Sequence, residues 1–179
     1  MLERVQRNMA NKITFTLDGK PVEAEAGMTI WEVANGRGLT IPHLCHKPAT
    51  GYRPDGNCRA CMVEVDGERT LVASCIREPS DGMVVTTNSA RAKSARKMVV
   101  EMLLADQPEK DVSHDKSSHL WEMVELSGVN QSRLPKLEKD RIPLLDDSHV
   151  AMRVNLDACI QCGLCVRACR EVQVNDVIG

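Results

Sequence analysis

The sequence predicts an α+β fold in which a small sheet domain precedes a helical segment and a second, cysteine-rich domain. Three observations predict it. Short runs between residues 12 and 88 alternate apolar and polar side chains and are separated by Gly-containing turns. Residues 89–105 repeat apolar side chains with helical period. Eight cysteines fall into two groups of four, with none in the 83 residues between the groups.

The first domain is predicted element by element from these patterns. Asp18-Gly19 is a hairpin turn between two alternating runs, and Asp66-Gly67 is a second one. Thr29 is a helix cap, and the helix that it starts ends at Gly36. A hairpin, a helix, a long loop, a second hairpin and a last strand follow the order of a β-grasp ferredoxin. The predicted elements are strands 13–17 and 22–24, helix 30–34, and strands 62–65, 70–73 and 83–87.

Composition excludes several function classes and favours a reducing compartment. The net charge of −2 does not indicate binding to nucleic acid or to an anionic membrane surface. No run of 18 apolar residues is present, and the N-terminus lacks the apolar stretch of a secretory signal, so we expect a cytoplasmic protein without membrane insertion. An aromatic content of 2% favours several small units held by metal centres or partner surfaces over one large core.

The first cysteine group has the spacing C-x12-C-x2-C-x13-C and lies mostly in Gly- and Pro-containing loop sequence. Four thiolates on irregular backbone, with one C-x2-C turn, favour an iron–sulfur cluster. Disulfides are disfavoured in a cytoplasmic chain, and a zinc ribbon needs paired knuckles that this group lacks. All four cysteines are present, so His43 and His46 are expected to face solvent or to lie behind the ligands. The group is Cys45, Cys58, Cys61 and Cys75.

The second cysteine group forms the run C-x2-C-x2-C-x3-C, the bacterial ferredoxin signature for [4Fe–4S] clusters. The first three thiols are expected to share one cluster, and Cys169 to point to another, as in two-cluster ferredoxins. Two alternatives remain: Cys169 completes a single cluster, or the sequence is the front part of a longer polypeptide, which we favour. In the second case the terminal cluster is expected to be labile or absent in the 179-residue chain. The group is Cys159, Cys162, Cys165 and Cys169.

Two fragments carry a resemblance to a known family. Residues 41–46 (IPHLCH) and 58–65 (CRACMVEV) resemble the N-terminal [2Fe–2S] domain shared by three kinds of oxidoreductase: the large iron–sulfur subunit of complex I, NAD-reducing and iron-only hydrogenases, and molybdenum- or tungsten-dependent formate dehydrogenases. The resemblance implies a [2Fe–2S] cluster on the first cysteine group. Residues 165–179 look most like the alpha subunit of NAD-dependent formate dehydrogenase.

One segment departs from the family pattern. Most relatives have His-x3-Cys-x2-Cys-x5-Cys after the long helix, as ligands of a further [4Fe–4S] cluster. The matching residues here are Gln107, Asp111, His114 and Leu120. Carboxylate, imidazole and leucine replace soft thiolates poorly, so we predict that this cluster is absent. Binding of another metal by Asp111, His114 and His119 is a minor alternative.

The remaining segments complete the predicted domain organisation. The helix over 89–105 places Ala95, Met98, Val99, Met102 and Leu103 on one stripe, and its basic residues (Arg91, Lys93, Arg96, Lys97) on a solvated face or against an acidic partner. A short helix over 118–127 ends at Gly128. The predicted boundaries are a β-grasp domain at 12–88, a helical segment at 89–129, a linker at 130–149 and a ferredoxin-type domain at 150–179.

The resulting functional prediction is an electron carrier without a catalytic centre of its own. The resemblance implies that it is part of an NAD-dependent formate dehydrogenase, whose molybdopterin, FMN and NAD are bound elsewhere in the parent complex. Its partners would be the remaining catalytic part of the enzyme and a flavin- and NAD-binding subunit. The alternatives are an NAD-linked hydrogenase or complex I-like subunit, and a non-redox zinc-binding assembly module.

Overall fold

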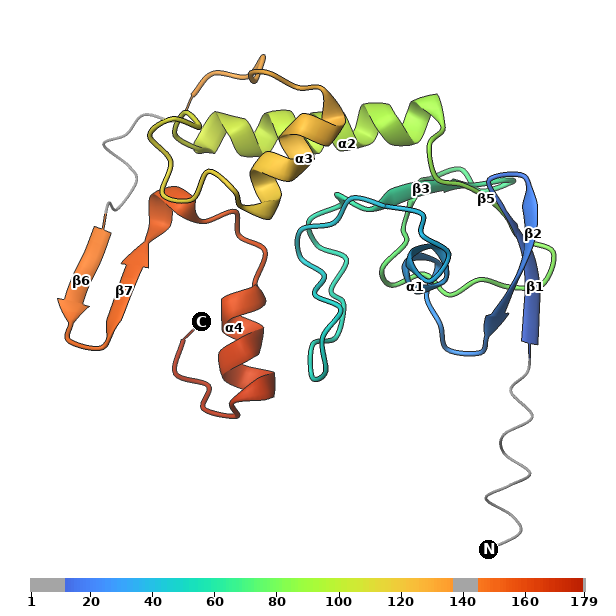
Figure 1. Ribbon diagram of the computed structural model, residues 1–179, viewed down its shortest axis with the longest axis horizontal. Helices are drawn as coiled ribbons and strands as arrows, with labels where there is room; N and C mark the ends of the chain where they lie inside the picture. The colour runs from blue at the N-terminus through green and yellow to red at the C-terminus, as the bar shows by residue number, and fades with distance from the viewer. Residues whose placement is uncertain (1–11, 137–144, 179) are drawn as a thin grey trace, which may run out of the picture.

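The computed structural model describes residues 12–136 and 145–178, and the N-terminal segment 1–11, expected to be frayed or docked on a partner, lies outside them. Figure 1 shows a sheet wrapped around α1 at one end, α2 and α3 above it, and the β6–β7 hairpin and α4 at the other end. Among the described residues no helix is long and apolar enough to cross a membrane.

The sheet has five strands in the order β2-β1-β5-β3-β4. The two hairpins are antiparallel, and β5 joins them by pairing parallel to β1 and antiparallel to β3. This mixed sheet around one helix confirms the α+β, β-grasp prediction. The strands are β1 (Lys12–Leu17), β2 (Lys20–Glu25), β3 (Met62–Val65), β4 (Val72–Ala73) and β5 (Val84–Thr86).

The Asp18-Gly19 turn has the predicted geometry and a further contact. Both residues have positive φ (49° and 79°), as the tight turn between twisted strands requires. The Asp18 carboxylate also accepts hydrogen bonds from the backbone N–H of Thr87 at 2.7 Å and from its hydroxyl at 2.6 Å. The first hairpin is therefore tied to the end of β5.

Helix α1 (Ile30–Asn35) fills the concave side of the sheet. Thr29 and Glu32 form a complete capping box, which satisfies two backbone donors at the start of the helix. Trp31 is buried in the core with Phe15, Leu17 and Val63. Its Nε1 donates to the carbonyl of Ile41 at 3.1 Å, which fixes the start of the long cysteine loop.

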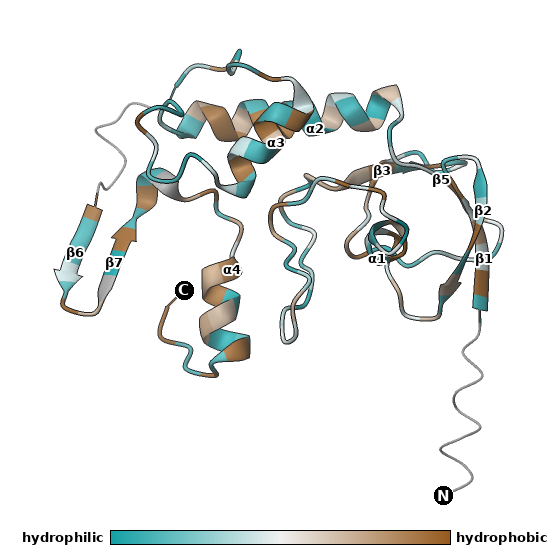
Figure 2. Ribbon diagram, in the orientation of Figure 1, coloured by the Kyte–Doolittle hydropathy of each residue, from teal (hydrophilic) through white to brown (hydrophobic). Residues whose placement is uncertain are grey.

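A second core lies between α2 (Ala90–Asp106) and α3 (His119–Ser127). Figure 2 shows hydrophobic segments on both helices where they lie together. The two helices pack through Leu104, Leu120 and Met123, with Leu103 partly buried against them, and α3 ends at Gly128 with a φ of 65°. The buried members are Leu44, Ala60, Val100, Leu104, Leu120, Trp121, Met123, Val124 and Val129.

The predicted buried stripe of α2 is wrong by about one residue position. Met98 and Met102 are 43% and 48% exposed, and the buried face instead runs through Ala92, Arg96 and Val100. Arg96 is therefore neither solvated nor available to a partner. It is accommodated because its guanidinium donates to the carbonyl of Thr87 and, through Nε, to that of Ala92 at 3.3 Å.

The C-terminal part contains the hairpin of β6 (Leu145–His149) and β7 (Met152–Asn155), followed by α4 (Leu164–Arg167) and a π-helical turn (Ala168–Val172). Residues 145–149, assigned to the linker from the sequence, therefore form a strand. Residues 137–144 of that linker lie outside the described residues. The chain therefore stays helical past Cys169.

Replacing Arg96 with Ala tests its unexpected role in the fold. The change leaves the Thr87 carbonyl without its buried donor, so the free energy of unfolding should fall by about 1–3 kcal/mol. Urea unfolding of the full chain measures this. Lys93→Ala, on the exposed side of the same helix, should change the free energy by less than about 0.5 kcal/mol, and equal effects of the two variants would contradict the assignment.

Candidate metal-cluster sites

The first cysteine group converges from two loops around the edge of the sheet. Cys45 and Cys58 lie on the loop between α1 and β3, Cys61 directly precedes β3, and Cys75 follows β4. Cys45, Cys61 and Cys75 are buried, whereas Cys58 is half-buried. Their side chains lie near one another, since Cys45 and the neighbouring Cys58 and Cys75 affect one another's pKa, as do Cys61 and Cys75. The structure thus brings all four predicted residues together.

The cysteines of the first group shift one another's pKa in opposite directions. Hydrogen bonds from the Cys58 and Cys75 thiols hold the pKa of Cys45 well below its usual range. The same hydrogen bonds raise the pKa of Cys58 and of Cys75. The group therefore favours a thiolate at Cys45, and thiolate is the form that binds metal.

Backbone groups support the sulfurs from close range. The N–H groups of Cys45 and Ala60 both donate to the sulfur of Cys58 at 3.4 Å. Gly56 has a φ of 64°, which favours glycine, and a Cβ there would lie 2.7 Å from the Cδ1 of Ile76, so a larger residue would displace that side chain.

Ser74 ties the last cysteine to the third. Its hydroxyl donates to the carbonyl of Cys61 at 2.8 Å, and its backbone N–H reaches the same oxygen at 3.2 Å. Its own carbonyl accepts from the N–H of Trp31 at 3.0 Å. The separation of Cys61 and Cys75 is therefore set by the contact between β3, β4 and α1.

The two histidines beside Cys45 pack against Trp31. The ring centroids lie 4.7 Å from Trp31 for His43 and 4.6 Å for His46, with the rings edge to face. His46 is buried and its two ring nitrogens have no hydrogen-bond partner among the described residues. Burial lowers the pKa of both side chains, which favours the neutral form of the two imidazoles that pack on Trp31. His46 does not face solvent.

The second cysteine group lies on the loop before α4 and on the turns that follow. Gln161 and Gly163 have positive φ (53° and 70°), which wraps the loop tightly. Backbone N–H groups reach the sulfurs of Cys159 (from Gln161) and Cys169 (from Val177) at 3.4 Å. Burial raises the pKa of Cys162, with the neighbouring Cys165 and Cys159 sulfurs adding to the effect. The structure thus brings the first three of these cysteines together, with Cys169 one turn further along.

Of the four residues that replace the expected third ligand set, Gln107, His114 and Leu120 line one pocket, whereas Asp111 does not. Leu120 is buried in the second core, Asp111 and His114 are exposed, and Gln107 donates from Nε2 to the carbonyl of Cys159 at 3.0 Å. Across residues 12–136 and 145–178, no three or more His, Cys, Asp and Glu side chains, the two cysteine groups included, have the arrangement of a single-ion site. The absence of a cluster here stays a prediction.

The chemistry of the two cysteine groups fits iron–sulfur clusters. Each supplies four thiols and no carboxylate or imidazole ligand, and backbone N–H groups point at the sulfurs of both. Iron–sulfur clusters are held by thiolates in this way, with N–H donors to sulfur tuning them. A cluster contains two or four irons, so its ligands need not surround one ion.

Comparison with known proteins decides the family. Residues 10–90 match the 2Fe-2S iron-sulfur cluster binding domain, and residues 152–171 match the 4Fe-4S binding domain. A chain in the crystal structure of an NAD+-reducing [NiFe]-hydrogenase in the H2-reduced state is 30% identical, with a TM-score of 0.79, and the match covers 93% of this chain and 70% of that one. The chain belongs to the same family of iron–sulfur proteins as this hydrogenase chain. It thus contains a [2Fe–2S] domain followed by a [4Fe–4S] motif, as expected.

Other members of the iron–sulfur family are much longer. The chain is 33% identical over 93% of its length to NADP-reducing hydrogenase subunit HndD of Solidesulfovibrio fructosivorans, of which it covers 29%. It is 34% identical over 94% of its length to the mitochondrial 78 kDa subunit of NADH-ubiquinone oxidoreductase of Candida albicans, of which it covers 23%. A putative formate dehydrogenase, YrhE of Bacillus subtilis, is 31% identical over 93% of this chain, which covers 17% of that protein.

Exchange of one ligand tests the assignment of the first group. Cys58→Ser should abolish the [2Fe–2S] EPR signal of the reduced protein and leave any [4Fe–4S] signal, because the two groups share no cysteine. Cys162→Ser is the matched control and should have the converse effect. Survival of the [2Fe–2S] signal in Cys58→Ser would contradict the assignment of this residue.

Iron content tests the prediction for residues 107–120. Unmodified protein should bind no iron there, whereas combining Gln107→His, Asp111→Cys, His114→Cys and Leu120→Cys should add iron, because it restores the soft ligands. Iron analysis and EPR measure both, and Leu120→Cys alone controls for loss of packing. A [4Fe–4S] cluster found at this segment in the unmodified chain would disprove the prediction.

Proposed function

We propose that the chain is the iron–sulfur electron-transfer segment of an NAD-dependent formate dehydrogenase in the cytoplasm. In this proposal it relays electrons between a molybdopterin site that oxidises formate, outside these 179 residues, and a flavin- and NAD-binding subunit. Its contribution is to hold two clusters, with Cys45, Cys58, Cys61 and Cys75 around one, and Cys159, Cys162, Cys165 and Cys169 as ligands of [4Fe–4S] chemistry.

The observation that carries the relay function is the contact between the two cysteine loops. The guanidinium of Arg167 donates from one nitrogen to the carbonyl of Cys45 and to that of Cys162, the latter at 3.3 Å. Residues from the two groups are therefore joined through a single side chain. When bound, iron–sulfur clusters accept and donate single electrons, and neighbouring sites in one chain suit such a relay.

Sequence similarity supports a formate dehydrogenase as the parent enzyme. Residues 165–179 resemble the alpha subunit of NAD-dependent formate dehydrogenase, and one relative is described as a putative formate dehydrogenase. Cysteines that bind iron–sulfur clusters act as thiolates and not as disulfides, which agrees with a cytoplasmic location.

A second candidate function is electron transfer in an NAD-linked hydrogenase or a complex I-like oxidoreductase. The observation that favours it is the TM-score of 0.79 to a chain of the NAD+-reducing [NiFe]-hydrogenase structure. HndD, a subunit of an NADP-reducing hydrogenase, also matches over 93% of this chain. Both candidates use the same cysteine groups and differ in the electron donor.

Electron donors distinguish the two candidates in the isolated native complex that contains this chain. Formate should reduce the [2Fe–2S] cluster, seen by EPR, and support NAD+ reduction, whereas hydrogen should do neither. Cys58→Ser should lower formate-dependent NAD+ reduction by about tenfold or more, with formate oxidation by a soluble dye retained as the control. Reduction by hydrogen and not by formate would replace the proposal with the second candidate.

A further inference from the structure

Arg167 is a buried cation that none of the sequence patterns singled out. It is the last residue of α4 and only 4% exposed. A buried guanidinium is costly unless charged and polar groups surround it. Its surroundings therefore show what the chain uses it for.

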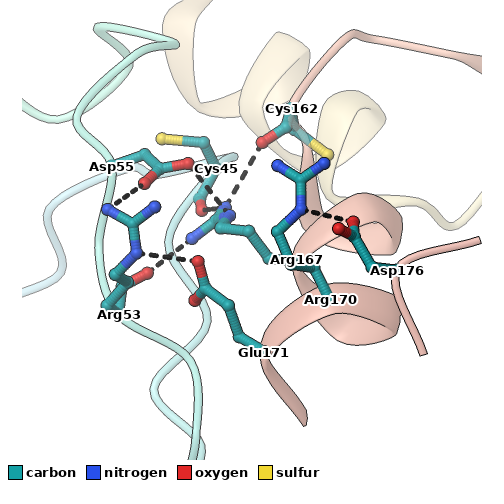
Figure 3. A network of polar contacts seen from close by, with 8 residues as sticks. All are labelled: Cys45, Arg53, Asp55, Cys162, Arg167, Arg170, Glu171 and Asp176. Atoms are coloured by element: carbon teal, nitrogen blue, oxygen red, sulfur yellow. Dashed lines mark hydrogen bonds and ion pairs between the residues drawn. The ribbon is translucent and has the colours of Figure 1, made fainter. Parts of the chain in front are cut away.

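Almost every partner of Arg167 lies on the loop of the first cysteine group. Nη1 donates to the carbonyl of Arg53, Nη2 donates to the carbonyl of Cys45, and Nε lies 3.0 Å from Oδ2 of Asp55. Nη2 also donates to the carbonyl of Cys162 in its own segment. Figure 3 shows the guanidinium inserted between the two loops, with Asp55 on one side and Cys162 on the other.

A second layer of contacts holds this arrangement. Arg53 pairs with Glu171 at 2.8 Å and with Asp55 at 3.2 Å, so the acid that faces Arg167 is itself held in place. Val172 lies against Gly51, since a Cβ on that glycine would be 3.4 Å from Cγ2 of the valine. The C-terminal helical turns thus contact the first loop on both sides of Arg167.

The fork geometry of arginine explains the residue type. Three nitrogens of one planar group reach two carbonyls of the first loop, one carbonyl of the second and a carboxylate. A lysine ammonium is a point charge on a flexible stem and cannot hold acceptors in several fixed directions. The contact is therefore specific in orientation as well as in charge.

We propose that Arg167 is a positioning residue that locks the [4Fe–4S] loop onto the [2Fe–2S] loop and thereby fixes the two cluster sites relative to each other. This inference rests on the ligand sets of the proposed function. Through its charge, Arg167 also affects the reduction potential of the [2Fe–2S] cluster. Cluster potentials respond to local charge and hydrogen bonding, and a cation at the Cys45 carbonyl favours the more negative, reduced state, so Arg167 raises the potential of the [2Fe–2S] site.

The test compares Arg167→Ala and Arg167→Lys in the full 179-residue chain with Arg170→Ala. Arg170 is the matched control because it lies on the next turn, is about half exposed and pairs with Asp176 at 2.6 Å without touching the first loop. Asp55→Asn, which keeps Arg167 and removes its anionic partner, provides an independent variant should Arg167→Ala fail to fold. Hydrogen exchange in β1 and β2 reports global folding in each case.

The first readout is amide hydrogen exchange of the metal-free chain, which needs no cluster. Exchange in residues 45–58 and 159–172 should rise roughly tenfold in Arg167→Ala, less in Asp55→Asn, and remain unchanged in Arg170→Ala. The second readout is the midpoint potential of the reconstituted [2Fe–2S] cluster. The potential should fall in Arg167→Ala. It should stay near the wild-type value in Arg167→Lys, because lysine keeps the charge. Amide exchange in the two cysteine loops of Arg167→Lys should still be faster than in the wild type.

Two results would overturn the inference. One is unchanged exchange in both loops for Arg167→Ala, or for Asp55→Asn if Arg167→Ala does not fold. The other is an equal effect of Arg170→Ala, which would show that any loss of charge in this segment suffices. Iron and sulfide analysis of the wild-type chain tests the proposed function separately. If no cluster is found, the proposed function fails, but the exchange comparison still tests the role of Arg167 because it uses the metal-free chain.

Discussion

The structure depends on holding a long irregular loop in one conformation. Residues 41–61 carry three of the first four cysteines and form no helix or strand, so regular backbone hydrogen bonds cannot fix them. Side chains from three distant elements perform this task. Trp31 of α1 donates to the carbonyl of Ile41, Ser74 donates to that of Cys61, and Arg167 of α4 donates to that of Cys45.

The same loop joins the two hydrophobic cores. Cys61 belongs to the core between the sheet and α1, with Cys75 beside it, whereas Ala60 belongs to the core formed by α2 and α3 and Cys58 packs against it. Ile160, next to the first cysteine of the second group, packs on this second core too. Because interiors are closely packed, a shift of either core moves cysteine sulfurs.

The segment of residues 107–120 is held by packing and hydrogen bonding. Leu120 is 4% exposed in the second core. Gln107 supports the carbonyl of Cys159. The helical segment therefore links the two cysteine loops through side chains whose role is structural.

The sequence by itself determined the features that depend on neighbouring residues. The Asp18-Gly19 turn, the helix cap at Thr29, the strand alternation and the cysteine spacing all act over short range, and each is found where it was expected. Only the tertiary structure decided which face of α2 is buried, because Arg96 finds acceptors that helical periodicity does not reveal. It also turned the end of the expected linker into β6 by pairing it with β7. The role of Arg167 required the full fold as well, since its acceptors at Arg53 and Cys45 lie 114 and 122 residues away in the chain.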